Sequence, residues 1–337
     1  MSKSSGFKRM AKCTEFYIFI VLIVLCIVVH VVSGGQLLVP DKIFTILRAM
    51  IVDGIFALCS LVIMISGGFD LSFPAIAAVS YSVATTICLN CGWCTSNPLA
   101  GFVIAIVIGL VLGMFNGWII ANFKLNTMLV TLGTQTLFTG LSMGLLKMHE
   151  ITSKLPAGFK ALGTAKITSY TATIGSRQVT SDLSVCVIFL VIFVVVTSFI
   201  LRKTMFGRAL YAIGGNEVSA ERAGYNVKRV KFILYTVVGA VCGFAGMLRV
   251  CLTSQSVPKA LIGKEMTIIP AVILGGASIF GGEGTVFGTM CAIGIITVVS
   301  NSMIVLGIPT AWQDLFNGII ILIGITVSAV QAKRRNG

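Results

Sequence analysis

The sequence predicts an all-α polytopic membrane protein, and three observations support this fold class. Of its 337 residues, 56% are hydrophobic and only 11% are charged, whereas soluble domains carry about 25% charged residues. The apolar residues form runs of roughly 17–25 residues, the length that a helix needs to cross a bilayer. No run alternates apolar and polar residues as the strands of a membrane barrel do. A soluble domain, a disordered chain and a coiled coil are therefore excluded.

Apolar segments separated by Gly, Pro and clusters of charge follow one another along the chain. We expect about ten transmembrane helices, in segments 16–33, 44–66, 71–89, 98–122, 127–146, 183–201, 231–252, 265–280, 284–305 and 312–331. Nine or eleven are alternatives, because 265–280 is short and the runs near Gly67 and Gly275 are broken. The first segment is too long for the apolar core of a signal peptide and lacks a cleavage site, so we expect it to stay uncleaved. The chain is thus predicted to be one transmembrane domain, 1–337, with a membrane-spanning region at 16–331.

The net charge of +14 comes from 25 Lys and Arg against 11 Asp and Glu. These cations fall mostly in short breaks between apolar runs, where they set topology and contact lipid headgroups. We therefore expect membrane lipids and no nucleic acid as partners. A cytoplasmic N-terminus places most of the cations inside, above all the cluster at 202–231. An even number of spans then places the C-terminus in the cytoplasm as well.

The ten cysteines lie mostly inside apolar runs, where a thiol behaves as a small hydrophobic group. Only Cys91 and Cys94 have C-x-x-C spacing in a predicted loop. Two ligands are too few for a zinc site, so an optional disulfide or no role is expected, and no metal is predicted.

Two apolar segments, 63–70 and 271–278, each end in a Gly-Gly pair. Glycine-interrupted helices in transporters often mark the pathway and belong to inverted repeats. We place the two segments five spans apart, which would give the two halves opposite orientations, and so predict an inverted 5+5 repeat. The alternative is a chance similarity of glycine-rich helices. The predicted helix breaks are Gly67, Gly68, Gly275, Gly276, Gly281 and Gly282. The stretch Gly281–Gly284 lacks the Lys-Ser/Thr of a phosphate loop, so we expect no ATP site in this chain.

Four blocks resemble, in order, the permease subunits of ribose-type ABC importers. Ser66-Gly-Gly-Phe-Asp-Leu-Ser72 is similar to the family's Gly-Gly-Ile-Asp-Leu-Ser. Leu129-Val-Thr-Leu-Gly-Thr134 follows Asn116-Gly as in the family, Ala212-Ile-Gly-Gly-Asn-Glu217 resembles its cytoplasmic loop, and 272–285 resembles its late glycine-rich stretch. The chain departs from the family at 126–128, where Pro-Pro-Phe is usual, and at Thr267, where Asp is usual. These departures bear on the substrate more than on the transport role.

The resemblance implies a permease subunit of a bacterial importer in the plasma (inner) membrane, working by alternating access. Its implied partners are a cytoplasmic ATP-binding subunit, an extracellular or periplasmic sugar-binding protein and a second permease subunit, identical or different. ATP would be bound by the partner, so no cofactor is expected here. The expected substrate is a monosaccharide such as ribose. Alternatives are a permease for nucleosides or a cyclic signalling sugar, or an ion-coupled secondary transporter. An intramembrane enzyme lacks its usual motifs here.

Polar residues within the apolar runs are the candidates for the substrate pathway. Asp70 is predicted either to cap the helix that follows Pro74 or to bind a polyol. Asp53 needs a partner or a watery cavity; it either pairs with Arg48 or binds sugar. The remaining candidates, each with helix packing as the alternative role, are Ser72, Asn116, Thr131, Thr134, Gln135 and Glu265.

The basic segment 202–231 is predicted to be a cytoplasmic loop that contains a two-turn helix. Asn216, which follows Gly215, is placed at the N-cap of this helix, Glu217 in its first turn and Arg222 in its last turn. Gly224 is predicted to end the helix. The resemblance implies that this loop engages the ATPase subunit. The alternative is a connecting loop with a lipid-facing basic rim.

Overall fold

A computed structural model gives the fold of the chain and describes residues 14–35, 39–91, 97–145, 150–152, 155–174, 177–305, 308–309, 312–313, 315–319, 322 and 326. The long helices are α2 (Thr14–Val32), α3 (Pro40–Ile65), α4 (Phe73–Asn90), α5 (Pro98–Phe123), α8 (Val187–Lys203), α11 (Val227–Thr253) and α13 (Val286–Val305). The shorter ones are α6 (Thr127–Gly140), which runs into a π-helical turn η2 (Leu141–Leu145), α7 (Ala157–Thr164), α9 (Met205–Gly215), α10 (Glu217–Arg222), the 3-10 turn η3 (Pro258–Leu261) and α12 (Glu265–Leu274).

The helices confirm a polytopic membrane protein. Six of the described helices are long and apolar enough to cross a membrane, or seven when the bent pair α8 and α9 counts as one span. Each predicted segment from 16–33 to 284–305 contains a described helix. The segment 265–280 is helical only to Leu274, because Gly275 and Gly276 end α12 there. The segment 312–331 lies largely outside the described residues.

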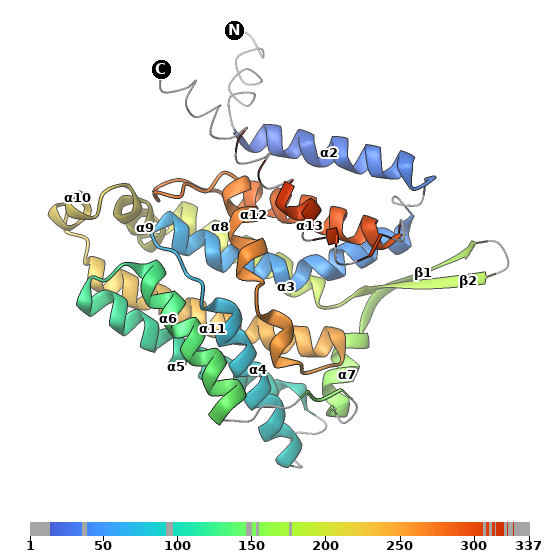
Figure 1. Cartoon of the computed structure of the whole chain (residues 1–337), viewed down its shortest axis with the longest axis horizontal. Helices are drawn as coiled ribbons and strands as arrows, with labels where there is room; N and C mark the ends of the chain where they lie inside the picture. Colours follow the sequence, from blue (N-terminus) through green and yellow to red (C-terminus); the bar gives the residue numbers. More distant parts are fainter. Residues whose placement is uncertain are drawn as a thin grey trace, which may run out of the picture.

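A seam of glycines joins α5 to the central helix α11. A Cβ atom at Gly109 would lie 2.3 Å from the carbonyl oxygen of Gly239, and one at Gly243 would lie 2.1 Å from that of Ala105. Any side chain at these positions would push the two helices apart, which is why small residues are enriched where membrane helices touch. The seam fixes α5 against α11 (Figure 1).

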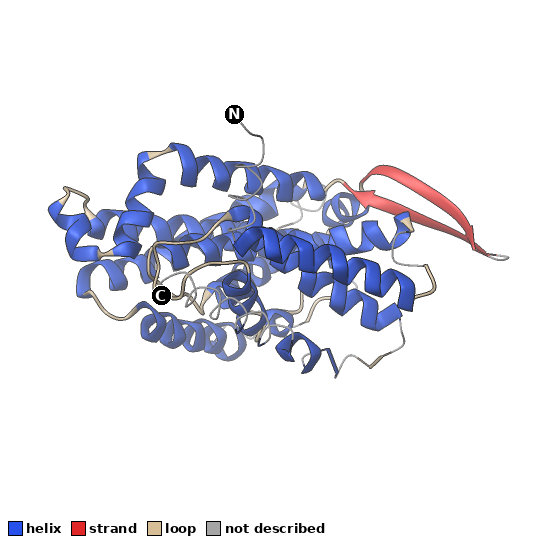
Figure 2. Cartoon of the chain, turned by 90° about the horizontal axis from the view of Figure 1, so that it is seen from above, coloured by secondary structure: helices blue, strands red, loops and turns tan. Residues whose placement is uncertain are grey.

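The bundle has two distinct ends along its long axis (Figure 1). One, the α10 end, carries α9 and α10. The other, the hairpin end, carries α7 and two antiparallel strands, β1 (Lys166–Ile174) and β2 (Arg177–Ser184). The hairpin projects well beyond the helices (Figure 2). The expectation of helices alone is wrong here, because this Thr-rich stretch lies between two apolar runs and the absence of strand patterns within the runs does not bear on it.

The two glycine-terminated helices end in the same local structure. The N–H of Gly67 donates to the carbonyl of Met64, and that of Gly68 donates to Ile63; Gly276 and Ala277 repeat the pattern at the end of α12. Gly67 and Gly276 have φ of +79° and +91°, as a left-handed C′ residue of this motif requires. The structurally equivalent residues are therefore Gly67 and Gly276. Alignment of the two Gly-Gly pairs, which matches Gly67 with Gly275, is shifted by one residue.

These two helices run parallel, so they are not counterparts in an inverted repeat. Lys264, just before α12, pairs with Asp53 on α3, and Gly282, beyond the end of α12, donates to the carbonyl of Ile65 at the end of α3. The predicted opposite orientation is wrong because six spans, not five, separate the two segments. The segments are the second and the eighth in the predicted order, and a chain that reverses at each crossing gives these the same direction.

Candidate functional site

The connection between α3 and α4 is built around the Asp70 carboxylate. Its Oδ1 atom accepts hydrogen bonds from the backbone N–H of Ser72, at 2.7 Å, and from the Ser72 hydroxyl, at 2.6 Å. Ser72 is the N-cap residue of α4, and Phe73 is the first residue of the helix. Pro74 follows at the second helical position, where a missing N–H costs nothing. The predicted cap is therefore not formed in the usual way: Ser72, not Asp70, occupies the N-cap position, and Asp70 holds the turn before α4 through its bonds to Ser72.

Neighbouring helices hold this connection through side chains that the sequence singled out. Asn116 on α5 donates from Nδ2 to the Ser72 hydroxyl at 2.7 Å, and the Thr131 hydroxyl on α6 accepts from the N–H of Leu71 at 3.1 Å. Asp70, Ser72, Asn116 and Thr131 are all buried. The Thr134 hydroxyl instead donates to the carbonyl of Thr131 in its own helix.

A second buried polar contact lies one helical turn further along α6. Gln135 donates from Nε2 to Oε1 of Glu265, the first residue of α12, at 2.6 Å. Glu265 is only 3% exposed, and its Oε2 atom has no hydrogen-bond partner among the described residues. A buried acceptor without a partner is costly, and Oδ1 of Asn116 is in the same condition among the described residues.

Asp53 pairs with a residue that the sequence did not indicate. Its Oδ2 atom lies 3.0 Å from Nζ of Lys264, whereas Arg48 donates to the backbone carbonyls of Leu252 and Gly163 at 2.7 and 3.4 Å. The predicted pair of Arg48 and Asp53 is wrong. Residues five apart on a helix point roughly 140° away from each other, and a pair spanning two helices leaves no local spacing to detect.

The segment between α8 and α11 is more helical than a loop. α9 follows α8 after a bend of 72°, and α11 already begins at Val227, so Lys231 belongs to a helix. The predicted two-turn helix is present as α10: the Asn216 side chain accepts from the N–H of Ser219 at 2.8 Å, and Gly224 has φ of +90°. Glu217 lies in the first turn and Arg222 in the last.

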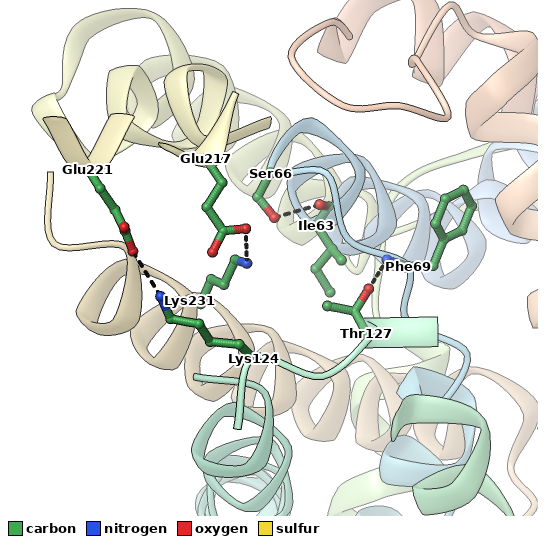
Figure 3. A network of polar contacts seen from close by, with 8 residues as sticks. All are labelled: Ile63, Ser66, Phe69, Lys124, Thr127, Glu217, Glu221 and Lys231. Atoms are coloured by element: carbon green, nitrogen blue, oxygen red, sulfur yellow. Dashed lines mark hydrogen bonds and ion pairs between the residues drawn. The ribbon is translucent and has the colours of Figure 1, made fainter. Parts of the chain in front are cut away.

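Two ion pairs fasten α10 to the bundle (Figure 3). Oε2 of Glu217 lies 2.7 Å from Nζ of Lys231 on α11, and Oε1 of Glu221 lies 3.4 Å from Nζ of Lys124 at the end of α5. The second pair is exposed and weak. Glu217 therefore makes the closer connection between α10 and the membrane helices.

Three Gly-Gly pairs meet beside α10. We call Gly67, Gly214, Gly281 and Gly282 the glycine junction. A Cβ atom at Gly214 would lie 1.8 Å from the carbonyl oxygen of Ile65 and 2.5 Å from the amide nitrogen of Gly282. One at Gly281 would lie 2.6 Å from the Cα of Gly67. The end of α3, the end of α9 and the connection from α12 to α13 are thus in direct backbone contact.

A cavity of about 290 Å³ opens beside the junction. Its walls come from the end of α3, the start of α6, the segment joining α9 to α10, α11, and the connection after α12. The polar and aromatic side chains that line it are Ser66, Thr127, Asn216, Glu217, Lys231, Tyr235 and Phe280. Sequence reasoning missed Tyr235 because it lies in an apolar stretch of α11, and it included Lys231 only as the last residue of the basic segment 202–231.

Comparison with known proteins gives one family and several relatives. A family model described as "Branched-chain amino acid transport system / permease component" matches residues 42–325. A ribose import permease protein, RbsC, of Bacillus subtilis (strain 168) is 32% identical over 307 residues, which cover 91% of this chain and 90% of the relative. The L-arabinose ABC transporter permease protein AraH of Azospirillum brasilense is 29% identical over 298 residues, 88% of this chain and 83% of that one. The xylose transport system permease protein XylH of Haemophilus influenzae is 26% identical over 374 residues, 96% and 99% of the two chains. No solved structure matches.

Proposed function

The chain belongs to the family of branched-chain amino acid transport system permease components, and from this membership we propose that it is the permease subunit of an ABC importer for a monosaccharide. The similarity to a ribose import permease across nine tenths of both chains carries the proposal. The family description names amino acids, but the relatives above are named for ribose, arabinose and xylose. A pentose is therefore the first substrate to test.

The proposed topology has ten spans, with both termini and the α10 end in the cytoplasm of a bacterial cell and the helices in its inner membrane. Cations support this orientation, because cytoplasmic segments are enriched in Lys and Arg. Arg202 and Lys203 end α8, and Lys228, Arg229 and Lys231 begin α11, all at the α10 end. The hairpin end would then face outward, toward a sugar-binding protein.

In the proposed mechanism, α10 docks on a separate ATP-binding subunit, which holds the nucleotide, so this chain carries no cofactor of its own. Closure of the ATPases would displace α10 and α9. The glycine junction would pass that displacement to the end of α3 and to the connection between α12 and α13, because their backbones touch. A second permease subunit, identical or different, would complete the pathway.

The pathway itself would be lined by Asp53, Asp70, Ser72, Asn116, Thr131, Thr134 and Glu265. Their contacts divide them into two roles. Asp70, Ser72, Asn116 and Thr131 bond one another or the backbone and keep the α3–α4 connection in shape. Glu265 would use its buried, unpartnered Oε2 atom to accept a hydrogen bond from a sugar hydroxyl. A pathway with few other polar contacts would hold the sugar weakly and so favour its release.

The experiment is uptake into proteoliposomes that hold this chain, its ATP-binding subunit and any second permease, with the binding protein outside. We expect ATP-dependent uptake of labelled ribose, arabinose or xylose, and none of labelled leucine. Uptake that follows an imposed ion gradient without ATP would instead identify a secondary transporter.

A further inference from the structure

The connection between α12 and α13 contains a small closed loop, residues 278–284, which we call the α12–α13 loop. The N–H of Ser278 donates to the carbonyl of Glu283 at 3.0 Å and so closes the loop, and the N–H of Gly281 donates to the carbonyl of Ser278 at 3.2 Å. Between them, the N–H of Phe280 donates to the Ser278 hydroxyl at 3.2 Å. Hydrogen bonds within the loop therefore define its shape.

The α12–α13 loop is fastened to two other helices at the α10 end of the bundle (Figure 1). The N–H of Gly282 donates to the carbonyl of Ile65 at the end of α3, at 2.9 Å. The hydroxyl of Tyr211 on α9 donates to the carbonyl of Gly284, at 2.8 Å. Gly284 lies two residues before α13, which begins at Val286. The loop thus contacts α3 and α9 and leads into α13.

Phe280 presents an apolar ring to the outside of the molecule. Its side chain is 89% exposed, more than any other large hydrophobic side chain among the described residues. Hydrocarbon does not cover it, because Glu283 in the same loop is exposed and the ion pairs of α10 lie at the same end, and such charges are costly inside a bilayer. An exposed aromatic side chain in a polar region is typical of a protein interface.

The α12–α13 loop continues the surface of α10. Phe280 lines the same cavity as Asn216 and Glu217, and a Cβ atom at Gly282 would lie 3.1 Å from the Cα of Gly215, just before α10. α10 has only six residues, whereas stable interfaces use about 20–30 residues on each side. A partner that docks on α10 therefore needs more surface, and the loop supplies an adjoining apolar contact.

We propose that the α12–α13 loop is a second docking point for the ATP-binding subunit, with the ring of Phe280 seated in an apolar pocket of that subunit. The proposal rests on the proposed function and adds an interaction surface to it. Because the loop contacts the end of α3 and leads into α13, the ATPase would act on these two helices directly, as well as through α10 and α9.

The first test is binding of the purified ATP-binding subunit to this chain, with any second permease, in lipid nanodiscs. Phe280→Ala removes the ring and keeps the hydrogen bonds of the loop, which come from the backbone and Ser278. Phe199→Ala is the matched control, since Phe199 is 61% exposed within the apolar helix α8. We expect Phe280→Ala to weaken binding at least about tenfold, as truncation of a central interface aromatic does, and Phe199→Ala to leave it unchanged. An unchanged Kd for Phe280→Ala overturns the proposal.

Photo-crosslinking in the assembled transporter identifies the occupant. The photoreactive analogue p-benzoylphenylalanine replaces Phe280 or, separately, Val218, which is 57% exposed on α10. We expect both positions to form an adduct with the ATP-binding subunit. An adduct of position 280 with a second permease or with lipid alone overturns the proposal, while an adduct of position 218 with the ATP-binding subunit leaves the proposed function standing. No adduct with that subunit from either position would contradict both.

Discussion

The N–H of Gly282 donates a 2.9 Å hydrogen bond to the carbonyl of Ile65, which ties the second glycine break to the end of α3. Gly214 packs over both partners of this bond. The end of α9, which leads into α10, therefore rests on a hydrogen bond between two helix ends that are far apart in the sequence. This contact links α9, and through it α10, to the ends of α3 and α12, beside the direct ion pair of Glu217 with Lys231 on α11.

Gly214→Ala tests that route. The added methyl group would lie 1.8 Å from the carbonyl oxygen of Ile65, so α9 must shift away from the junction. We expect uptake to fall at least about tenfold while the variant still reaches the membrane and retains the ATPase subunit. Gly133→Ala on α6 is the control, since its methyl group meets no atom within 4 Å. Equal uptake by both variants would show that the junction transmits nothing.

The pair of Asp53 and Lys264 predicts a double-mutant cycle. Lys264→Met leaves a lone carboxylate in the membrane region, which costs up to about 2.5–3.5 kcal/mol on insertion scales and less here, because both side chains keep about a third of their surface. We expect lower abundance and a lower Tm for Lys264→Met, and recovery of both in Asp53→Asn/Lys264→Met. A double variant less stable than either single variant would contradict the pairing.

Exchange of the charges of Glu217 and Lys231 distinguishes two roles of Glu217: holding α10 against α11, or contacting the ATPase subunit directly. Glu217→Arg places two cations in contact and should detach α10 from α11, which lowers uptake and the ATP hydrolysis that the binding protein stimulates. Glu217→Arg/Lys231→Glu restores an ion pair, and we expect it to restore much of both activities. Failure of the double variant, with normal membrane abundance, would mean that Glu217 itself contacts the ATPase subunit.

Substitutions of Asp70 distinguish a hydrogen-bond acceptor from a required charge. Asp70→Asn keeps an oxygen for the N–H and the hydroxyl of Ser72, so abundance and uptake should stay near normal. Asp70→Ala removes the acceptor of the N–H and hydroxyl of Ser72, and a buried donor left without its partner costs about 1–3 kcal/mol. We expect a lower abundance of Asp70→Ala in membrane fractions. Full uptake by this variant at normal abundance would show that Asp70 is dispensable.

Local patterns allowed much of the fold to be predicted from the sequence. Run length located the helices, and Asn216 and Gly224 marked the ends of α10, because capping depends on residues close in sequence. Contacts between distant helices were beyond such reasoning. Lys264 pairs with Asp53 across 211 positions, and Tyr235 lines a cavity from the middle of an apolar run. Gly214 could be identified only as part of the motif at 212–217, because its role depends on contacts with backbone segments that are distant in the sequence.

The most direct measurement of the central claim is solute accumulation by the purified chain, alone and then with its partners. We predict that proteoliposomes holding this chain alone accumulate no pentose against a gradient, with or without ATP. Addition of the ATP-binding subunit, the second permease where one exists and the binding protein should produce uptake that stops when ATP hydrolysis is blocked. Uphill accumulation by the chain alone would contradict the claim that a separate ATPase drives it.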